Sequence, residues 1–506
     1  MPPTARPDAP RNPPALLLML LVLLGSVRLV FPGDTHFIND EPQLIARALE
    51  DNAAGRLTTH GLRGTRGMDY GPLPIWIYRG LLLLSHDLLT IVLLRTLLVT
   101  TLTATALVWL ARTCPFLLPA AGALAFVSPY LWLYSRDLWD NSFNIPFVAL
   151  AFAAYVAFCR EHRTANLVVA AFGCVAAFLT HLMSLPLCAA IGLHFVLFER
   201  EWIRRHVRQA VVLGAACAGV AAPYLAHLAS GSGGNALLSS GKWRSFFFAI
   251  AGGRFFTATG LDYFLGEARL FGEGTLLHAA ELMLISLTCL AFPLIAWGAW
   301  RSFRVVTSRD TTRASREAFA PAFVALTTLV LHVALAWSHR LTEHPHYYNA
   351  CWIAFLFCLW WGVSECSRRG WGRILCGTYA VALTVMLVAV PLHLHRTQGN
   401  RELHYGPTLA NQLEIARQLN ALSATLSSDV PLTPIARHPG EFPHALAVLR
   451  RLEATRQPTP RSLPDTLFVD VDAAETGTLE IGYAAPNAKH DGRVSLSRGR
   501  MQTAAN

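Results

Sequence analysis

The sequence predicts an all-α polytopic membrane protein with a small α/β module at its C-terminal end. Of its 506 residues, 53% are hydrophobic and only 15% are charged. Apolar runs of about 18 to 25 residues recur along the chain, and each is long enough to cross a bilayer core of roughly 30 Å as a helix. Most of the surplus arginine lies in short connectors between these runs, which is typical of cytoplasmic loops.

Charge and cysteine content exclude several other classes of protein. Because the excess arginine lies in loops, the formal net charge of +10 calls for no nucleic-acid partner. The ten cysteines lie in or near apolar runs, and the sequence contains no CxxC motif. This usage indicates neither a disulfide framework nor a zinc ribbon.

The first 14 residues are rich in proline and are predicted to form a disordered cytoplasmic leader. Residues 15–392 are predicted to form the transmembrane domain, with the N-terminus inside and the C-terminus outside. The segment 72–85 is expected to insert only partly, because a full span there would place later arginine clusters opposite the leader. The eleven predicted spans cover residues 15–31, 88–111, 116–134, 142–159, 165–183, 185–199, 210–229, 275–300, 319–337, 348–365 and 372–392.

The first exterior loop, residues 32–87, contains a predicted helix in EPQLIARALED. Asp40 at the N-cap and Gln43 three residues later form a capping box. An apolar stripe along this segment suits a helix that lies on the membrane surface. The stripe comprises Leu44, Ile45, Ala48 and Leu49.

Residues 393–506 are predicted to form an exterior accessory module that mixes two helical patterns with short strand patterns. Asp470-Val471-Asp472 looks like a metal-binding DxD motif. It lies in the alternating strand pattern TLFVDVD, with no nucleotide-binding fold around it, so a structural role is favoured.

The acidic pair Asp40-Glu41 follows the first span directly. A carboxylate at the outer edge of the bilayer can have a raised pKa and act as a general base. The alternative is that Asp40 only caps the helix that follows. The two roles are compatible, since a capping carboxylate is also an oriented one.

Two later polar clusters lie between predicted spans. In the motif SRDLWDN, Asp137 and Asp140 can bind a divalent cation through their carboxylate oxygens. The alternative is that Arg136 pairs with an acid and Asp140 caps the next span. Around HRLTEHPHYY, Arg340 can bind a phosphate, and His344 or His346 can assist a leaving group or bind a metal. The alternative there is an interfacial belt of aromatic and histidine side chains.

With these residues in place, the chain resembles the C-type membrane glycosyltransferases. The likeness is closest to the protein O-mannosyltransferases, the lipid A aminoarabinose transferase and the lipopolysaccharide galacturonosyl transferases. Its motifs are Asp40-Glu41 after the first span, the segment GPLPIW at 71–76, and Ser128-Pro129 leading to Arg136-Asp137. The His or Lys that usually precedes the proline pair is replaced by Tyr70-Gly71, which puts in question a metal or phosphate contact from that position.

The resemblance implies transfer of a sugar from a polyprenyl-phosphate donor to an exterior acceptor, which is a lipid, a glycan or a protein. In this interpretation Asp40 is the general base and Glu41 assists it. The phosphate would be bound by Arg136, Arg340, His344 and His346. Asp137 and Asp140 would hold a divalent metal ion, the one cofactor under consideration. The expected location is a bacterial inner membrane, with the active site facing the periplasm.

Two other classes remain open from the sequence. A transporter or flippase would show repeated halves and charges near the bilayer midplane, whereas the polar clusters here lie at one predicted membrane edge. A polysaccharide polymerase or ligase would depend on Arg and His in a late loop, with no acid after the first span.

Overall fold

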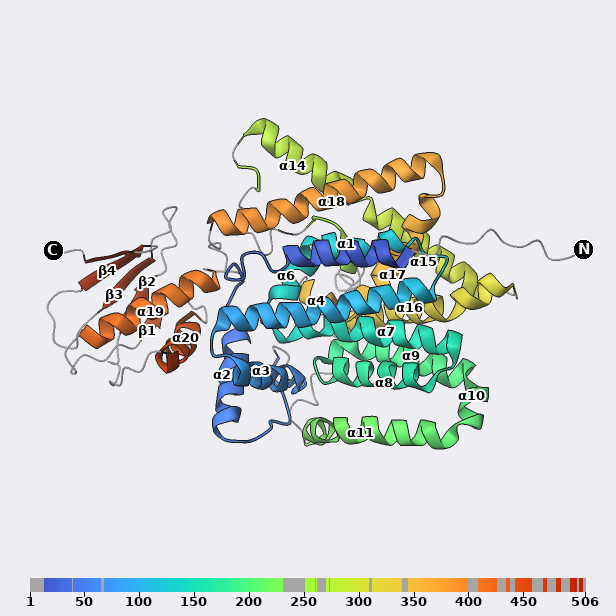
Figure 1. The fold of residues 1–506 in the computed structure, drawn as a ribbon, viewed down its shortest axis with the longest axis horizontal. Coiled ribbons are helices and arrows are strands. Elements are labelled where there is room, and N and C mark those ends of the chain that lie inside the picture. The colour runs from blue at the N-terminus through green and yellow to red at the C-terminus, as the bar shows by residue number, and fades with distance from the viewer. Residues whose placement is uncertain are drawn as a thin grey trace, which may run out of the picture.

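The computed structural model describes most of the membrane domain and the ordered elements of the C-terminal region. Its helices run side by side through most of the molecule, and the strands lie beyond one end of the helical bundle (Figure 1). The described residues are 13–38, 40–64, 68–230, 251–259, 261, 270–272, 274–308, 312–338, 345–397, 408–425, 434–436, 442–456, 467–470, 479–483, 492–497 and 500–503.

Helix α1 (Pro13–Val27) lies along α4 (Leu88–Thr113), whereas α2 (Asp40–Ala53) runs across one end of the bundle beside α3 (Leu73–Leu84) (Figure 1). The predicted apolar stripe exists, with Leu44, Ile45 and Ala48 buried. The stripe packs against protein, because α2 contacts α3 and the C-terminal helix α20 (Phe442–Arg456). The expectation that this face lies on the membrane surface is therefore wrong.

Helix α4 (Leu88–Thr113) matches the second predicted span, but the next predicted span is not a continuous helix. Residues 116–134 contain the short elements η1 (Pro119–Ala123) and α5 (Leu124–Val127) and the start of α6 (Pro129–Arg136). Proline explains the breaks, since it lacks a donor N–H and disfavours helical backbone in the residue before it. Ser128 precedes Pro129 with an extended backbone, and its hydroxyl accepts from the N–H of Leu131.

The remaining predicted spans correspond to helices with shifted ends. A break at residues 289–290 divides the predicted span 275–300. The elements in chain order are η2 (Asp140–Phe143), α7 (Asn144–Glu161), α8 (Thr164–Phe178), η3 (Leu182–Ser184), α9 (Leu185–Phe198), α10 (Arg200–Arg205), α11 (Val207–Ala229), η5 (Ala251–Phe256), α14 (Thr275–Thr288), α15 (Ala291–Thr307), α16 (Arg313–Ser338), η6 (Pro345–Tyr348), α17 (Trp352–Cys366) and α18 (Gly370–Thr397).

The described helices are those of a multi-pass membrane protein. Among the described residues, six helices are long and apolar enough to cross a bilayer. They are Leu88–Thr113, Asp140–Glu161, Val207–Ala229, Thr275–Thr307, Ser315–Trp337 and Gly370–Thr397. Shorter apolar helices, such as Trp352–Cys366, pack among them.

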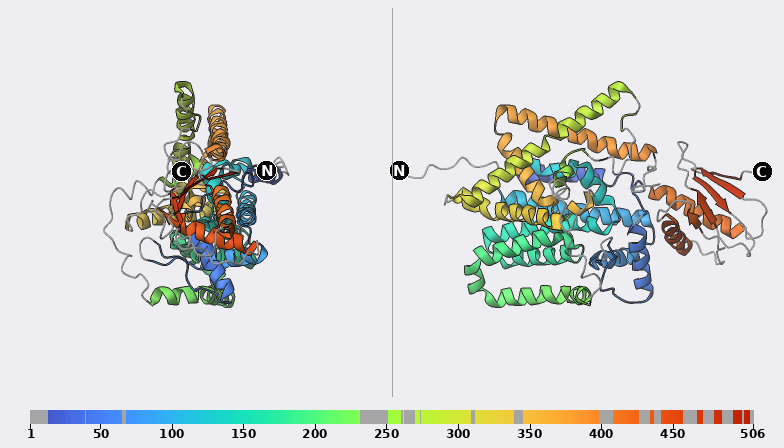
Figure 2. Two further views of the ribbon diagram at one scale, coloured as in Figure 1. Left: turned by 90° about the vertical axis from the view of Figure 1, so that its left-hand side faces the viewer. Right: turned by 180° about the vertical axis from the view of Figure 1, so that it is seen from behind.

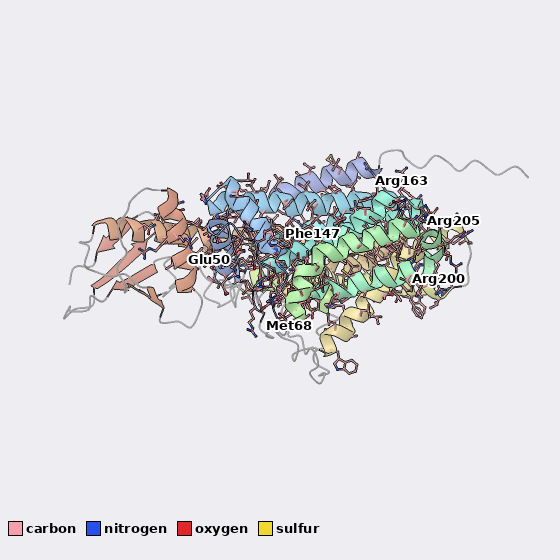
Figure 3. The ribbon with its side chains drawn as sticks, turned by 90° about the horizontal axis from the view of Figure 1, so that it is seen from below. Glu50, Met68, Phe147, Arg163, Arg200 and Arg205 are labelled. Carbon is pink, nitrogen blue, oxygen red and sulfur yellow. The ribbon has the colours of Figure 1, made fainter. Side chains whose placement is uncertain are left out.

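The two ends of the bundle differ in character. Arg163, Arg200 and Arg205 gather at one end, which we name the arginine end, whereas Glu50 of α2 lies toward the other (Figure 3). The end that carries α2 is named the loop end. These three arginines, which come from two connectors, therefore share one end of the bundle.

The C-terminal region contains two helices and a five-stranded sheet next to the loop end (Figure 2). The strands are β1 (Pro434–Ala436), β2 (Leu467–Asp470), β3 (Leu479–Tyr483), β4 (Gly492–Ser497) and β5 (Arg500–Thr503), in the spatial order β1-β2-β3-β4-β5. Strand β1 pairs with β2 in parallel, and the other pairs are antiparallel. Asp470 ends β2 opposite Glu480, while Asp472 lies outside the described residues.

Helix α19 (Leu409–Thr425) attaches the C-terminal region to the first loop. The N–H of Leu409 donates to the carbonyl of Thr35 at 2.8 Å, and that of Ala410 donates to Gly33 at 3.0 Å. A Cβ at Gly33 would lie 2.6 Å from the Cβ of Ala410, so only glycine permits this approach. The C-terminal region thereby contacts the segment that leads to Asp40.

Close glycine contacts hold α15 against α17. A Cβ at Gly298 would lie 1.7 Å from the carbonyl oxygen of Cys358, and one at Gly362 would lie 2.0 Å from that of Leu294. Both obstacles are backbone atoms, which cannot turn away as a side chain can. The two helices therefore pack with their backbones in close contact.

We expect Gly298→Ala to push α15 and α17 apart and to destabilise the protein by about 1–3 kcal/mol, the cost typical of overpacking. Gly192→Ala and Gly377→Ala are matched controls, since a Cβ at either position meets open space. Thermal unfolding of the purified protein in detergent checks the prediction. A midpoint for Gly298→Ala at or above those of the controls would contradict this packing.

Candidate active site

A buried cluster of ionisable groups lies at the loop end, beneath Asp40. The Nε2 atom of His36 is 2.9 Å from a carboxylate oxygen of Glu41 and 3.2 Å from one of Asp137. All three side chains are at most 1% exposed. His36 comes from the first loop, Glu41 from the first turn of α2, and Asp137 from the C-terminal end of α6. The cluster therefore joins the first loop to the segment after α6.

The protonation of this cluster follows from its charges. Burial by itself lowers the pKa of His36, but the carboxylates of Asp137 and Glu41 outweigh it and raise that pKa from 6.5 to about 9. Burial raises the pKa of Asp137 from 3.8 to about 7, against the opposing charge of His36. One imidazolium compensates only one of the two carboxylates, so the second retains a proton more readily.

Backbone groups fix the two carboxylates of the cluster in place. The N–H of Ile38 donates to Glu41 at 3.2 Å, so the side chain of Glu41 ties the loop to the start of α2. The N–H of Trp139 donates to Asp137 at 3.2 Å. Both carboxylates are therefore held from two sides.

Asp40 occupies a different environment from its neighbour Glu41. Its side chain is half-buried, and one carboxylate oxygen accepts a hydrogen bond from the indole N–H of Trp139 at 2.7 Å. The ring of Trp139 also contacts His346, with ring centroids 4.3 Å apart. The structure thus brings Asp40, Trp139 and His346 together from α2, the segment after α6 and η6.

Arg136 is buried rather than exposed to a ligand. Its Nη2 donates to the carbonyl of Phe31, and its guanidinium lies over the ring of Trp132 with the central carbon 4.2 Å from the ring centroid. The ring of Phe31 stacks on His395 of α18 with centroids 3.8 Å apart. Arg136 therefore connects α6 to the loop that leads to Asp40.

Asp140 is also buried, at the start of η2, and it accepts from the N–H of Asn141 at 2.6 Å. It is an electrostatic neighbour of Asp40. Among the described residues, the group that includes Asp137 and could hold a metal ion consists of His36, Glu41 and Asp137. The structure therefore combines Asp137 with these two residues, and Asp140 is an electrostatic neighbour of Asp137 as well.

A second group of possible metal ligands lies at the same end. Asp69 meets His227 of α11 at 2.7 Å, and the ring of His60 stacks on His227 with centroids 4.0 Å apart. The ligand atoms of these three residues lie within 4.8 Å of one another. A carboxylate with two imidazoles is a ligand set that suits zinc.

The unusual Tyr70-Gly71 pair has a structural explanation. A Cβ at Gly71 would lie 1.9 Å from the carbonyl oxygen of Leu179, so a larger residue cannot occupy this position. The ring of Tyr70 packs against His181, with centroids 4.2 Å apart. Burial lowers the pKa of His181 to about 3, so this imidazole is neutral.

Sequence reasoning missed His36, Trp139 and Arg95 as parts of this region. Arg95 is fully buried in α4 and donates to the carbonyls of Tyr134 and Ser135, which fixes the end of α6. An arginine inside an apolar span was a signal that could have found it. His36 offered no such signal. The predicted residues Arg340 and His344 lie outside the described residues.

Comparisons with known proteins support the fold. No family model matches the chain, and no curated protein matches it in sequence. Solved structures do match, and the chain shares their fold.

Two of the matching structures are of ArnT from Cupriavidus metallidurans. The structure bound to undecaprenyl phosphate matches with a TM-score of 0.52 at 14% sequence identity, over 90% of this chain and 93% of that chain. The structure in the apo state matches with a TM-score of 0.44 at 16% identity, over 90% of this chain and 92% of that chain.

We expect the stability of the protein to fall as the pH rises from about 6.5 to 9. Because the pKa of His36 is higher in the folded protein than its ordinary value of 6.5, its stabilisation is complete below pH 6.5 and is lost as the pH rises through about 9. The raised pKa of Asp137 acts in the same direction between about pH 4 and 7. Thermal midpoints measured across this range check the prediction.

A pair of variants assigns the effect to His36. At pH 6, where the imidazolium contributes in full, His36→Gln should lower the midpoint strongly, since breaking a buried ion pair costs about 3–5 kcal/mol. His86→Gln replaces an exposed histidine of the same loop and should leave the midpoint unchanged. Equal midpoints for the two variants, or a wild-type profile that rises toward pH 9, would show that the cluster does not stabilise the fold.

Proposed function

We propose that the chain is a membrane glycosyltransferase that moves a sugar from a polyprenyl-phosphate donor to an acceptor at the loop end, with Asp40 as the general base. The fold shared with ArnT, which was solved bound to undecaprenyl phosphate, supports this class of donor. The sugar and the acceptor are left open, and the acceptor class comprises a lipid, a glycan or a protein.

The observation that carries the proposal is the contrast between two adjacent acids. Glu41 is fully buried and is held by His36 and the N–H of Ile38, so it has a structural role. Asp40 is half-buried and is oriented by the indole of Trp139. A base needs both a fixed orientation and access to its substrate, and Asp40 combines the two.

The reaction that follows is a single displacement. Asp40 takes the proton of the acceptor hydroxyl or amine as that group attacks the anomeric carbon from the face opposite the phosphate. The new bond forms as the bond from carbon to the phosphate oxygen breaks, and the electron pair leaves with the polyprenyl phosphate. Cationic or hydrogen-bonding groups must stabilise that leaving group.

We assign contact with the leaving phosphate to His346, because it lies against Trp139 beside Asp40. Arg340 and His344 remain predicted phosphate contacts from the sequence. Arg136 was predicted for the same role, but its buried contacts with Phe31 and Trp132 favour a positioning role instead. It holds the loop from which Asp40 extends.

Two groups of residues at the loop end could bind a divalent metal ion. The residues His36, Glu41 and Asp137 offer nitrogen and oxygen ligands that suit a divalent ion, which would take the place of the proton on His36. Such an ion would supply positive charge at the loop end. The group of His60, Asp69 and His227 offers a second set of ligands at the same end.

An apolar groove between α1 and α4 is our candidate for contact with an isoprenoid chain. It has a volume of about 640 Å³ and runs from Leu18 on α1 to Leu29 just beyond the end of α1, and along α4 from Leu97 to Arg112. Its end at Leu29 is close in the chain to Phe31, whose carbonyl binds Arg136.

We expect Asp40→Asn to lower the rate of sugar transfer by about 10² to 10⁴, the range typical for loss of a general base. The amide has the size of the carboxylate and can still accept from Trp139, but it cannot take a proton. The measurement is release of polyprenyl phosphate by the purified protein from a panel of polyprenyl-phosphate sugars, with donor binding measured separately. Binding of the donor should be retained.

Asp87→Asn is the matched control, since Asp87 is another half-buried acid of the first loop. It should transfer sugar at the rate of the wild type. A normal rate for Asp40→Asn would mean that Asp40 serves only to start α2, and the base would then have to be sought at Asp140.

We further propose that the loop end faces the periplasm of a bacterial inner membrane, because the arginine end has the charge of a cytoplasmic surface. Leu57 is 65% exposed at the loop end and Arg205 is 70% exposed at the other. In intact cells, an impermeant thiol reagent should label Leu57→Cys, whereas Arg205→Cys should need permeabilisation. Labelling of Arg205→Cys without permeabilisation would reverse the orientation.

A further inference from the structure

A third group of ionisable side chains lies at the arginine end, away from the candidate active site. It consists of Cys159 near the end of α7, His194 in α9 and Glu199 between α9 and α10. One ligand atom from each residue lies within 4.8 Å of those of the other two. Helices α7 and α9 both reach this end of the bundle, where α10 turns the chain (Figure 1).

The environment of His194 indicates that its ring has an unused binding capacity. The side chain is 2% exposed, and the rings of Phe198, Phe319 and Phe323 surround it at centroid distances of 4.9 to 5.8 Å. Its Nδ1 is 2.8 Å from the hydroxyl of Tyr155. Its Nε2 has no hydrogen-bond partner among the residues that the structure describes.

A buried ring nitrogen without a partner is unfavourable in either tautomer. If Nε2 carries the proton, a donor is unsatisfied, and if it does not, a lone pair is unsatisfied. A metal ion removes this cost by binding the lone pair. Metal-ligating histidines are commonly held by a hydrogen bond at the other ring nitrogen, and Tyr155 provides such a contact.

Cysteine, histidine and glutamate together favour one class of metal ion. Thiolate, imidazole and carboxylate are the side chains that bind zinc in proteins, and a soft thiolate disfavours magnesium and calcium. Glu199 is 11% exposed, and its carboxylate is 3.5 Å from Nδ1 of His162, which follows α7. His162 contacts Glu199 from outside the group, which leaves the fourth position of a tetrahedral ion to a water molecule.

We propose that Cys159, His194 and Glu199 bind a zinc-class divalent ion, and that the ion holds the ends of α7 and α9 against the start of α10. The alternative is that Cys159 is a small packing residue and that His162 and Glu199 form an ordinary surface pair. This site is independent of sugar transfer, because it lies at the opposite end of the bundle from Asp40.

Cobalt(II) tests the proposal directly, because a thiolate bound to cobalt gives a near-ultraviolet charge-transfer band. Full-length protein in detergent is stripped with a chelator and titrated with Co²⁺. We expect the band to saturate near one ion per chain and to disappear when Zn²⁺ is added. The groups at the loop end contain no cysteine, so cobalt bound there cannot produce this band.

Variants then identify the ligands. Cys159→Ser should abolish the band, whereas Cys289→Ser, which replaces a half-buried cysteine outside the group, should retain it. Glu199→Gln preserves shape and keeps the thiol, so it serves even where Cys159→Ser fails to fold. It should weaken Zn²⁺ binding by at least about 100-fold. Loss of a residue that only contacts a metal ligand costs up to about 100-fold in affinity, and loss of a ligand itself should cost more.

Any of three results would overturn the proposal. The first is the absence of a thiolate band in folded wild-type protein at saturating Co²⁺. The second is a band that persists unchanged in Cys159→Ser, and the third is an unchanged Zn²⁺ affinity in Glu199→Gln. None of these results depends on whether the protein transfers a sugar, so a failure here is distinct from a failure of the proposed function.

Discussion

The loop end depends on one interaction, the contact of the buried imidazolium of His36 with the carboxylates of Glu41 and Asp137. Because buried charges are costly unless paired, this contact fixes the loop, the first turn of α2 and the end of α6 relative to one another. Asp40 and Trp139 extend from two of these segments. The cluster therefore fixes the two segments that the hydrogen bond between Asp40 and Trp139 joins, although neither residue belongs to the cluster.

Other contacts reinforce the same arrangement from outside. Arg136 binds the carbonyl of Phe31 in the first loop, Arg95 binds the carbonyls of Tyr134 and Ser135 at the end of α6, and α19 contacts the loop at Gly33 and Thr35. Residues 137–139, between α6 and η2, have an irregular backbone that carries Asp137 and Trp139 to the cluster. The loop end thus uses irregular backbone where it is buried in protein, as membrane proteins require.

The spans and the position of the acidic pair could be predicted from the sequence. The contacts between distant segments could not, for physical reasons. Hydropathy located most of the spans, and the charge of Asp40-Glu41 beside the first span pointed to the pair that contacts Trp139 and His36 in the structure. Local pattern could not show that His36 meets Asp137, because that contact depends on how distant segments pack. It also could not show that the stripe of α2 faces α20, since an apolar stripe fits a membrane surface and a protein surface equally well. The division of roles between Asp40 and Glu41 emerged only from their burial.

The central claim is that Asp40 activates the acceptor for direct displacement of the polyprenyl phosphate. The most direct test is the anomeric configuration of the transferred sugar, determined by nuclear magnetic resonance on product made from a donor of known configuration. Attack opposite the phosphate predicts inversion at the anomeric carbon. Retention would require a glycosyl-enzyme intermediate, with a carboxylate acting as a nucleophile, and would contradict the role assigned to Asp40.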